Sequence, residues 1–240
     1  MTAYSRLSLV LSGARDTLPL VVAAMPFGLV FGALAISSGF SATFAMAMSL
    51  FVFAGASQFI AISLLASAAA VPIVLFTVFV VNLRHLLYSA TLMKEVHRMP
   101  KWARPILSFW MTDETFAVVA NRKITHPDEP GLFWYYLGSA VFMYLNWQFC
   151  TWLGITAGEH IPDLSHWGLD VAMVVAFIGI VTPLLKDRGT WACAFTAMTS
   201  TFLTIHWPYQ LGFLFSCISA ITVGVLVTHH IAPGRQKWVK

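Results

Sequence analysis

The sequence Asn82-Leu83-Arg84-His85 is a polar group set inside an otherwise apolar part of the chain. Asn82 and His85 are three residues apart, so they would share one face of a helix. Ionisable groups within an apolar span usually face the interior of a helix bundle and mark a substrate or ion pathway. We therefore predict that Asn82 binds substrate and that Arg84 and His85 take part in proton coupling, although Arg84 could instead extend to the cytoplasmic headgroups.

Two adjacent carboxylates, Asp113 and Glu114, occupy the middle of a second apolar segment. Neighbouring side chains on a helix point about 100° apart, so these two do not form a catalytic dyad by themselves. One of them could pair with Arg84 or His85, and a carboxylate paired in this way inside a membrane is a natural proton carrier. We predict that both take part in proton coupling. The simpler alternative is solvation at the membrane surface.

The block Phe-Ala-Gly-Ala-Ser-Gln-Phe at 53–59 is the best candidate for a substrate site. Its small residues would admit a ligand or another backbone, and the amide of Gln58 offers two donors and an acceptor. Such an amide would suit the zwitterionic end of an amino acid, and the flanking rings would suit an apolar side chain. The alternative is a glutamine that is satisfied by a neighbouring helix. The predicted binding residues here are Phe53, Gly55, Ser57, Gln58 and Phe59.

Pro26 and Gly28 interrupt the first apolar run. Proline removes a backbone donor and obstructs the preceding helical turn, which frees carbonyl groups. A broken helix of this kind can line a substrate cavity, and on this interpretation Pro26 and Gly28 belong to the binding site. The alternative is a proline kink beside a packing seam, because Gly28 and Gly32 form the small-xxx-small pattern of closely packed helices.

These residues must be positioned by membrane helices. No ionisable residue occurs from Thr17 to Leu83, a run of 67 residues, and charged residues make up only 10% of the chain. A soluble domain carries about 25% charged residues. We predict an all-α, polytopic integral membrane protein with seven or eight transmembrane or re-entrant helices. The Lys and Arg residues form no basic stripe, so we expect no nucleic-acid partner.

One transmembrane domain is expected to cover residues 1–240. Each of its apolar segments has about the length that an α-helical crossing requires. The expected segments are 17–37, 42–66, 70–92, 105–121, 132–157, 169–186, 190–206 and 209–230.

The distribution of Lys and Arg sets the orientation. Strict alternation of eight spans, counted back from a cytoplasmic C-terminal tail, puts the basic loop 94–104 outside. If 105–121 is re-entrant, both neighbouring basic groups are cytoplasmic, and seven crossings leave the N-terminus outside. The other solution keeps eight crossings and a basic outer loop. A short similarity of 51–58 to 177–184 is compatible with two inverted halves, or with chance.

Several classes of function are unsupported. The sequence lacks the serine-hydrolase elbow, the H-E-x-x-H zinc motif, the P-loop and the dinucleotide fingerprint, so we expect no enzyme and no cofactor. The three cysteines, Cys150, Cys193 and Cys217, match no metal-binding spacing, and we expect no metal. A non-enzymatic membrane scaffold, or a pore subunit whose partner sets the activity, remains an alternative to a transporter.

Taken in order along the chain, the motifs resemble the AzlC family of branched-chain amino acid exporters. The resemblance implies a permease that exports leucine, isoleucine, valine and related apolar amino acids across a prokaryotic plasma membrane. It also implies a small AzlD-type membrane partner and coupling to the proton gradient. As the mechanism we predict alternating access. The motifs that carry it are Pro26-Phe27-Gly28, the block 51–59, the block 82–88 and Thr112-Asp113-Glu114.

Overall fold

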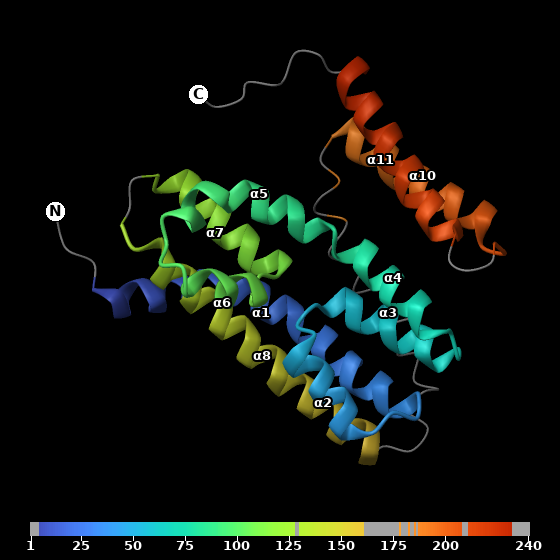
Figure 1. Ribbon diagram of the computed structural model, residues 1–240, viewed down its shortest axis with the longest axis horizontal. Coiled ribbons are helices and arrows are strands. Elements are labelled where there is room, and N and C mark those ends of the chain that lie inside the picture. Colours follow the sequence, from blue (N-terminus) through green and yellow to red (C-terminus); the bar gives the residue numbers. More distant parts are fainter. Residues whose placement is uncertain are drawn as a thin grey trace. The chain divides into compact units, whose positions relative to one another are not determined.

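A computed structural model describes residues 5–127, 130–160, 187–207 and 211–231, together with residues 178, 182 and 185. The chain divides into two compact units, Met1–Met173 and Val174–Lys240. In the described ranges the assigned secondary structure is helical (Figure 1), which confirms the predicted all-α fold class.

The first unit contains eight helices within its described residues. They are α1 Arg6–Ser37, α2 Ala42–Phe51, α3 Gly55–Ala66, α4 Val71–Asn82, α5 Arg84–His97, α6 Ala103–Phe109, α7 Asp113–Thr125 and α8 Leu132–His160. By length and composition, α1 and the α4–α5 stretch 71–97 are the two described helices able to span a membrane.

The two longest helices, α1 and α8, pack side by side and run in the same direction (Figure 1). A Cβ atom added at Gly13 would lie 2.0 Å from the carbonyl oxygen of Tyr135, and one added at Gly154 would lie 2.1 Å from that of Leu29. Contacts therefore advance along α8 as they advance along α1. Only glycine lets the two backbones approach so closely.

The helices α2 and α3 form a first hairpin, which approaches α8 from the end where α1 and α8 finish. Ala42, at the start of α2, lines a groove together with Glu159 near the end of α8. At the other end of α2, the hydroxyl of Tyr144 donates to the carbonyl oxygen of Leu50 at 3.1 Å. The chain then breaks and α3 turns back (Figure 1). The expected span 42–66 is thus two short helices.

The helices α6 and α7 form a second hairpin, which enters from the opposite end, where α8 begins. The hydroxyl of Tyr136 donates to the carbonyl oxygen of Leu107 in α6 at 3.0 Å. On the return path, Arg122 in α7 lies over the ring of Tyr135, 4.8 Å from its centroid. The expected segment 105–121 is therefore also divided into two short helices.

The helices α4 and α5 connect the two hairpins and are separated only by Leu83. The start of α4 follows the first hairpin, whereas Glu95 near the end of α5 pairs with Lys123 in α7, with 3.6 Å between Oε1 and Nζ. Together these helices return the chain to the end at which α1 begins. With seven crossings, the segments 17–37 and 132–157 would run antiparallel. The observed helices α1 and α8 are parallel, because the segment 42–66 reverses instead of crossing.

The second unit contains α10, Arg188–Thr204, and α11, Leu211–Ile231. They run antiparallel: a Cβ at Gly189 would meet Thr228, and a Cβ at Gly212 would meet Thr204. Asp187 caps the start of α10 by accepting from the amide of Thr190 at 2.8 Å. Most of the expected span 169–186, and most of the stretch compared with 51–58, lies outside the described residues.

Candidate functional site

The break between α4 and α5 carries a cluster of hydrogen-bonded polar side chains. Arg84 forms an ion pair with Asp113, whose other carboxylate oxygen accepts from the hydroxyl of Tyr88 at 2.8 Å. The side chains of Arg84 and Asp113 are 30% and 41% exposed, so the pair is reachable from outside the protein. Within the cluster, the predicted pairing of a carboxylate with Arg84 is thus made by Asp113.

The same break also holds the first hairpin. The hydroxyl of Ser57 in α3 donates to Oδ1 of Asn82 at 2.8 Å. Nδ1 of His85 lies 3.2 Å from the carbonyl oxygen of Asn82, and its ring meets that of Tyr88 edge-on. We call this cluster the polar junction; its members are Ser57, Asn82, Arg84, His85, Tyr88 and Asp113.

The N-terminus of α7 lies at the polar junction. Thr112 is the N-cap, and its hydroxyl accepts from the amide of Thr115 at 3.3 Å. Asp113 and Glu114 occupy the first turn, where a negative charge is favoured by the partial positive charge of the helix start. Glu114 is half-buried, but the ion pair with Arg84 and the hydrogen bond from Tyr88 both go to Asp113.

Gln58 lies apart from the junction, in a buried network between the first hairpin and α8. Its Nε2 donates to the hydroxyl of Ser49 at 3.0 Å, and that hydroxyl lies 2.8 Å from Oγ1 of Thr151. Gln148 donates to the carbonyl oxygen of Ser49 at 2.9 Å. The side chain of Gln58 is fully buried, and its Oε1 has no hydrogen-bond partner among the described residues.

The remaining predicted residues of the block 53–59 are packed within the first unit. Phe53 meets the ring of Tyr144, with 4.9 Å between centroids, whereas Phe59 packs edge-on against Phe31 at 5.8 Å. A Cβ at Gly55 would lie 2.9 Å from the ring of Trp147, so the small residue makes room for that ring. The two phenylalanines therefore face different neighbours.

Pro26 and Gly28 do not break their helix. The helix α1 is continuous from Arg6 to Ser37 through Pro26, which is exposed. A Cβ at Gly28 would lie 2.7 Å from Cβ of Cys150 in α8. The structure therefore corrects the interpretation of a broken first helix and supports the packing seam, because α8 fills the space beside Gly28.

Sequence reasoning missed three residues that hold the site together: Tyr88, Tyr144 and Gln148. Tyr88 lies one helical turn after Arg84, a spacing that places both on one face. Tyr144 and Gln148 are likewise one turn apart in α8, and both donate to carbonyl groups at the end of α2. Polar side chains at that spacing in an apolar helix were the available signal.

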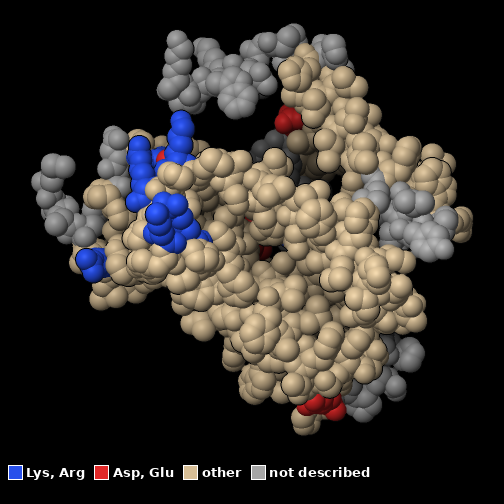
Figure 2. All heavy atoms as spheres, viewed as in Figure 1, with Lys and Arg blue, Asp and Glu red and all other residues tan. Residues whose placement is uncertain are grey.

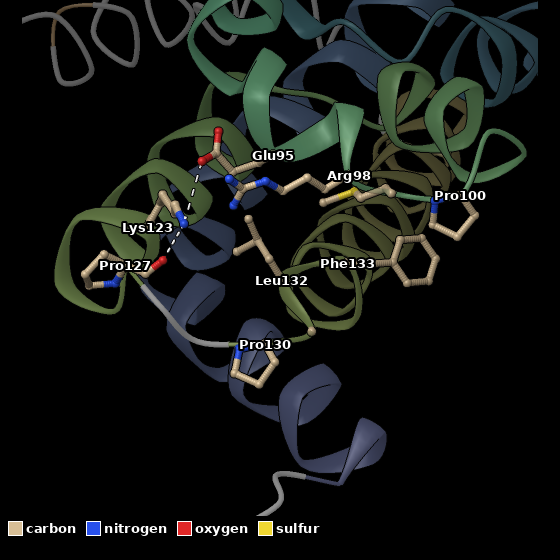
Figure 3. A pocket seen from close by; sticks show the side chains of 10 residues that line it. Glu95, Arg98, Pro100, Lys123, Pro127, Pro130, Leu132 and Phe133 are labelled. Atoms are coloured by element: carbon tan, nitrogen blue, oxygen red, sulfur yellow. Dashed lines mark hydrogen bonds and ion pairs between the residues drawn. The ribbon is translucent and has the colours of Figure 1, made fainter.

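A pocket of about 450 Å³ lies at the end of the first unit where α8 begins (Figure 3). Glu95 and Lys123 form an ion pair at its edge, and Leu132 and Phe133 contribute an apolar wall. None of the predicted site residues lines it. Within the described residues, no group of three or more His, Cys, Asp or Glu side chains could hold a metal ion.

A helical chain this apolar, with two interrupted hairpins around a polar centre, is a polytopic integral membrane protein. The chain belongs to the AzlC family: the model described as AzlC protein matches residues 19–161. The predicted resemblance is therefore confirmed.

Three relatives illustrate this membership. An uncharacterized membrane protein of Archaeoglobus fulgidus is 36% identical over 195 residues, 78% of this chain and 81% of the relative. The inner membrane protein YgaZ of Escherichia coli is 30% identical over 150 residues, 62% of this chain and 61% of YgaZ. The branched-chain amino acid transport protein AzlC of Bacillus subtilis is 28% identical over 173 residues, 72% of this chain and 66% of that protein. No solved structure matches.

Proposed function

We propose that this protein is a secondary transporter that exports branched-chain amino acids across the prokaryotic plasma membrane. The names of two relatives support this function, since one is a branched-chain amino acid transport protein and another an inner membrane protein. The substrates are leucine, isoleucine, valine and related apolar amino acids, and no enzymatic step is involved. A small membrane subunit of the AzlD type completes the permease.

The observation that carries the proposal is the ion pair of Arg84 and Asp113 at a helix break. Ionisable groups within membrane helices are costly and are retained where they serve a pathway. Protonation of Asp113 removes its charge and weakens its hold on Arg84. The freed guanidinium can then bind the carboxylate of an amino acid, since arginine and carboxylate groups match in geometry.

The remaining junction residues support a proton-coupled cycle. His85 lies between Asn82 and Tyr88, where an imidazole, which has one nitrogen that can donate and one that can accept, can pass a proton. Glu114, in the same turn as Asp113, is proposed as a second proton acceptor. Asn82 and Ser57 would bind the polar end of the substrate when their mutual hydrogen bond opens.

Efflux from vesicles tests the function directly. Vesicles that contain this chain with its small partner, loaded with radiolabelled leucine, should release it saturably and faster when a proton gradient is applied. The matched arms omit the partner or collapse the gradient with a protonophore. Release that is non-saturable and insensitive to the gradient would indicate a pore, and no release in any arm would leave the scaffold alternative.

A further inference from the structure

The two hairpins reach the same residue of α8 from opposite ends. From the first hairpin, Phe53 meets the ring of Tyr144 with 4.9 Å between centroids. From the second, Trp110 and Phe109 meet the same ring at 5.7 and 6.3 Å. Tyr144 lies near the middle of α8, so the two interrupted segments end at one level of the unit.

The interruptions are stabilised where they occur. A helix that ends inside a membrane leaves carbonyl groups that must find protein donors. Tyr144 supplies one to Leu50 at the end of α2, and Tyr136 supplies one to Leu107 in α6. Because α8 provides donors to both hairpins, their tips are built features of the fold and not frayed helix ends.

The meeting point has the chemistry of a binding site for an apolar side chain. Three aromatic rings from the two hairpins contact the ring of Tyr144, whose hydroxyl is directed to the carbonyl oxygen of Leu50. The indole N–H of Trp110 is shielded from solvent and has no hydrogen-bond partner among the described residues. A shielded donor beside aromatic walls suits a ligand with an apolar body and an acceptor oxygen.

We propose that Phe53, Phe109, Trp110 and Tyr144 form the site for the branched side chain of the substrate. The first hairpin closes this site from one side of the membrane and the second hairpin closes it from the other. The proposal rests on the proposed transport function and adds Tyr144 and Trp110 as residues that determine specificity.

The charges assign each hairpin to a side. In the first unit, described Lys and Arg residues other than Arg84 lie on the half where α1 and α8 begin, and Figure 2 shows them gathered there. The segment 38–70 at the other end has none. By the positive-inside rule the second hairpin is cytoplasmic and the first is external. The basic residues concerned are Arg6, Arg15, Lys94, Arg98, Lys101, Arg104, Arg122 and Lys123.

Both hairpins bind through side chains to the same break between α4 and α5. Ser57 in the first hairpin bonds Asn82, and Asp113 in the second pairs with Arg84, two residues further on. One hairpin can therefore be released while the other stays attached. This arrangement gives alternating access to one site, with the break at Leu83 as the fixed point.

Single cysteines at the two tips test the proposal. In a chain whose three native cysteines are replaced by alanine, Phe53→Cys and Phe109→Cys are labelled with a membrane-impermeant maleimide in cells and in inverted vesicles. Ser37→Cys and Lys101→Cys, both at exposed positions, calibrate the external and cytoplasmic sides. We expect Phe53→Cys to react from outside, Phe109→Cys from the cytoplasm, and leucine to slow both reactions at least threefold.

A second measurement tests the site itself. Tyr144→Ala should shift the ratio of phenylalanine to valine efflux at least fivefold toward phenylalanine, whereas Leu145→Ala, an exposed neighbour, should leave it unchanged. Labelling of both tips from one side would overturn the opposed hairpins. Leucine efflux without protection at either tip would overturn the site but not the function. Sided labelling together with no efflux by the chain that keeps Phe53 and Phe109 would instead contradict the transport function.

Discussion

The glycine seam between α1 and α8 allows a prediction whose sign depends on the packing. Replacing a glycine inside an exposed helix by alanine stabilises the helix by about 1 kcal/mol. At Gly138 the new Cβ would lie 2.0 Å from the carbonyl oxygen of Val10, and at Gly154 it would lie 2.1 Å from that of Leu29. Both obstructing atoms are backbone, so the two helices must separate by more than 1 Å.

Overpacking of this kind costs about 1–3 kcal/mol, which exceeds the gain in helix propensity. We therefore expect Gly138→Ala and Gly154→Ala each to be less stable than the wild type by up to about 2 kcal/mol. Gly158→Ala is the comparison variant in the same helix, because its Cβ would meet Cβ of Ile36 at 2.9 Å and no backbone atom closer than Cα of Ala33 at 3.3 Å. It should be destabilised less than Gly138→Ala and Gly154→Ala.

Unfolding of the purified protein in mixed micelles, followed by helical circular dichroism against increasing denaturing detergent, measures these differences. Efflux is recorded in parallel, since separation of α1 from α8 should also displace the first hairpin. Gly138→Ala as stable as Gly158→Ala, or more stable than the wild type, would refute the close parallel packing of the two helices.

Three further predictions concern single side chains. Asp113→Asn should keep the protein folded but make leucine efflux insensitive to the proton gradient, whereas Tyr88→Phe should retain the gradient response at a reduced rate; efflux assays with and without a protonophore separate them. Gln58→Leu should abolish valine efflux at unchanged membrane abundance, and Ser49→Ala, which removes the same hydrogen bond but keeps the amide, should not. Thr17→Val should lower the free energy of unfolding by about 1 kcal/mol without changing efflux, because it removes the 2.7 Å hydrogen bonds of the Thr17 hydroxyl to Ser139 and to the carbonyl oxygen of Gly13.

The sequence was sufficient to predict an integral membrane protein and the presence of an ion pair in the polar junction. One of Asp113 and Glu114 was predicted to pair with Arg84 or His85, because all four are ionisable groups inside apolar segments and such charges must be compensated. The sequence could not decide whether Asp113 or Glu114 forms the pair, because the two residues are adjacent and lie in equally apolar surroundings. The start of α7 decides it, because only Asp113 meets both Arg84 and Tyr88.

The hairpin 42–66 could not be recognised by hydropathy. It is as long and apolar as a crossing helix, and its break at Phe51–Gly55 contains no proline. What stabilises the reversal is the set of donors on α8, about a hundred positions away, and no local pattern reports these. Pro26 led to the opposite error. A break in the helix was predicted there, but α1 continues through Pro26 and packs closely against α8.

The first hairpin is held by a hydrogen bond and the second by an ion pair. In the proposed transport cycle, this difference can give transport its direction. The external hairpin is held by a neutral hydrogen bond from Ser57 to Asn82, which is worth about 1 kcal/mol and does not depend on pH near neutrality. The cytoplasmic hairpin is held by an ion pair that is lost when Asp113 takes a proton. In the proposed cycle, a proton arriving from outside would release the cytoplasmic hairpin, and amino acid would enter from the cytoplasm. Loss of that proton to the cytoplasm would restore the pair and close the hairpin behind the substrate. The opposite cycle would need a charged fastening on the external hairpin, and residues 38–70 contain no ionisable group that could provide one.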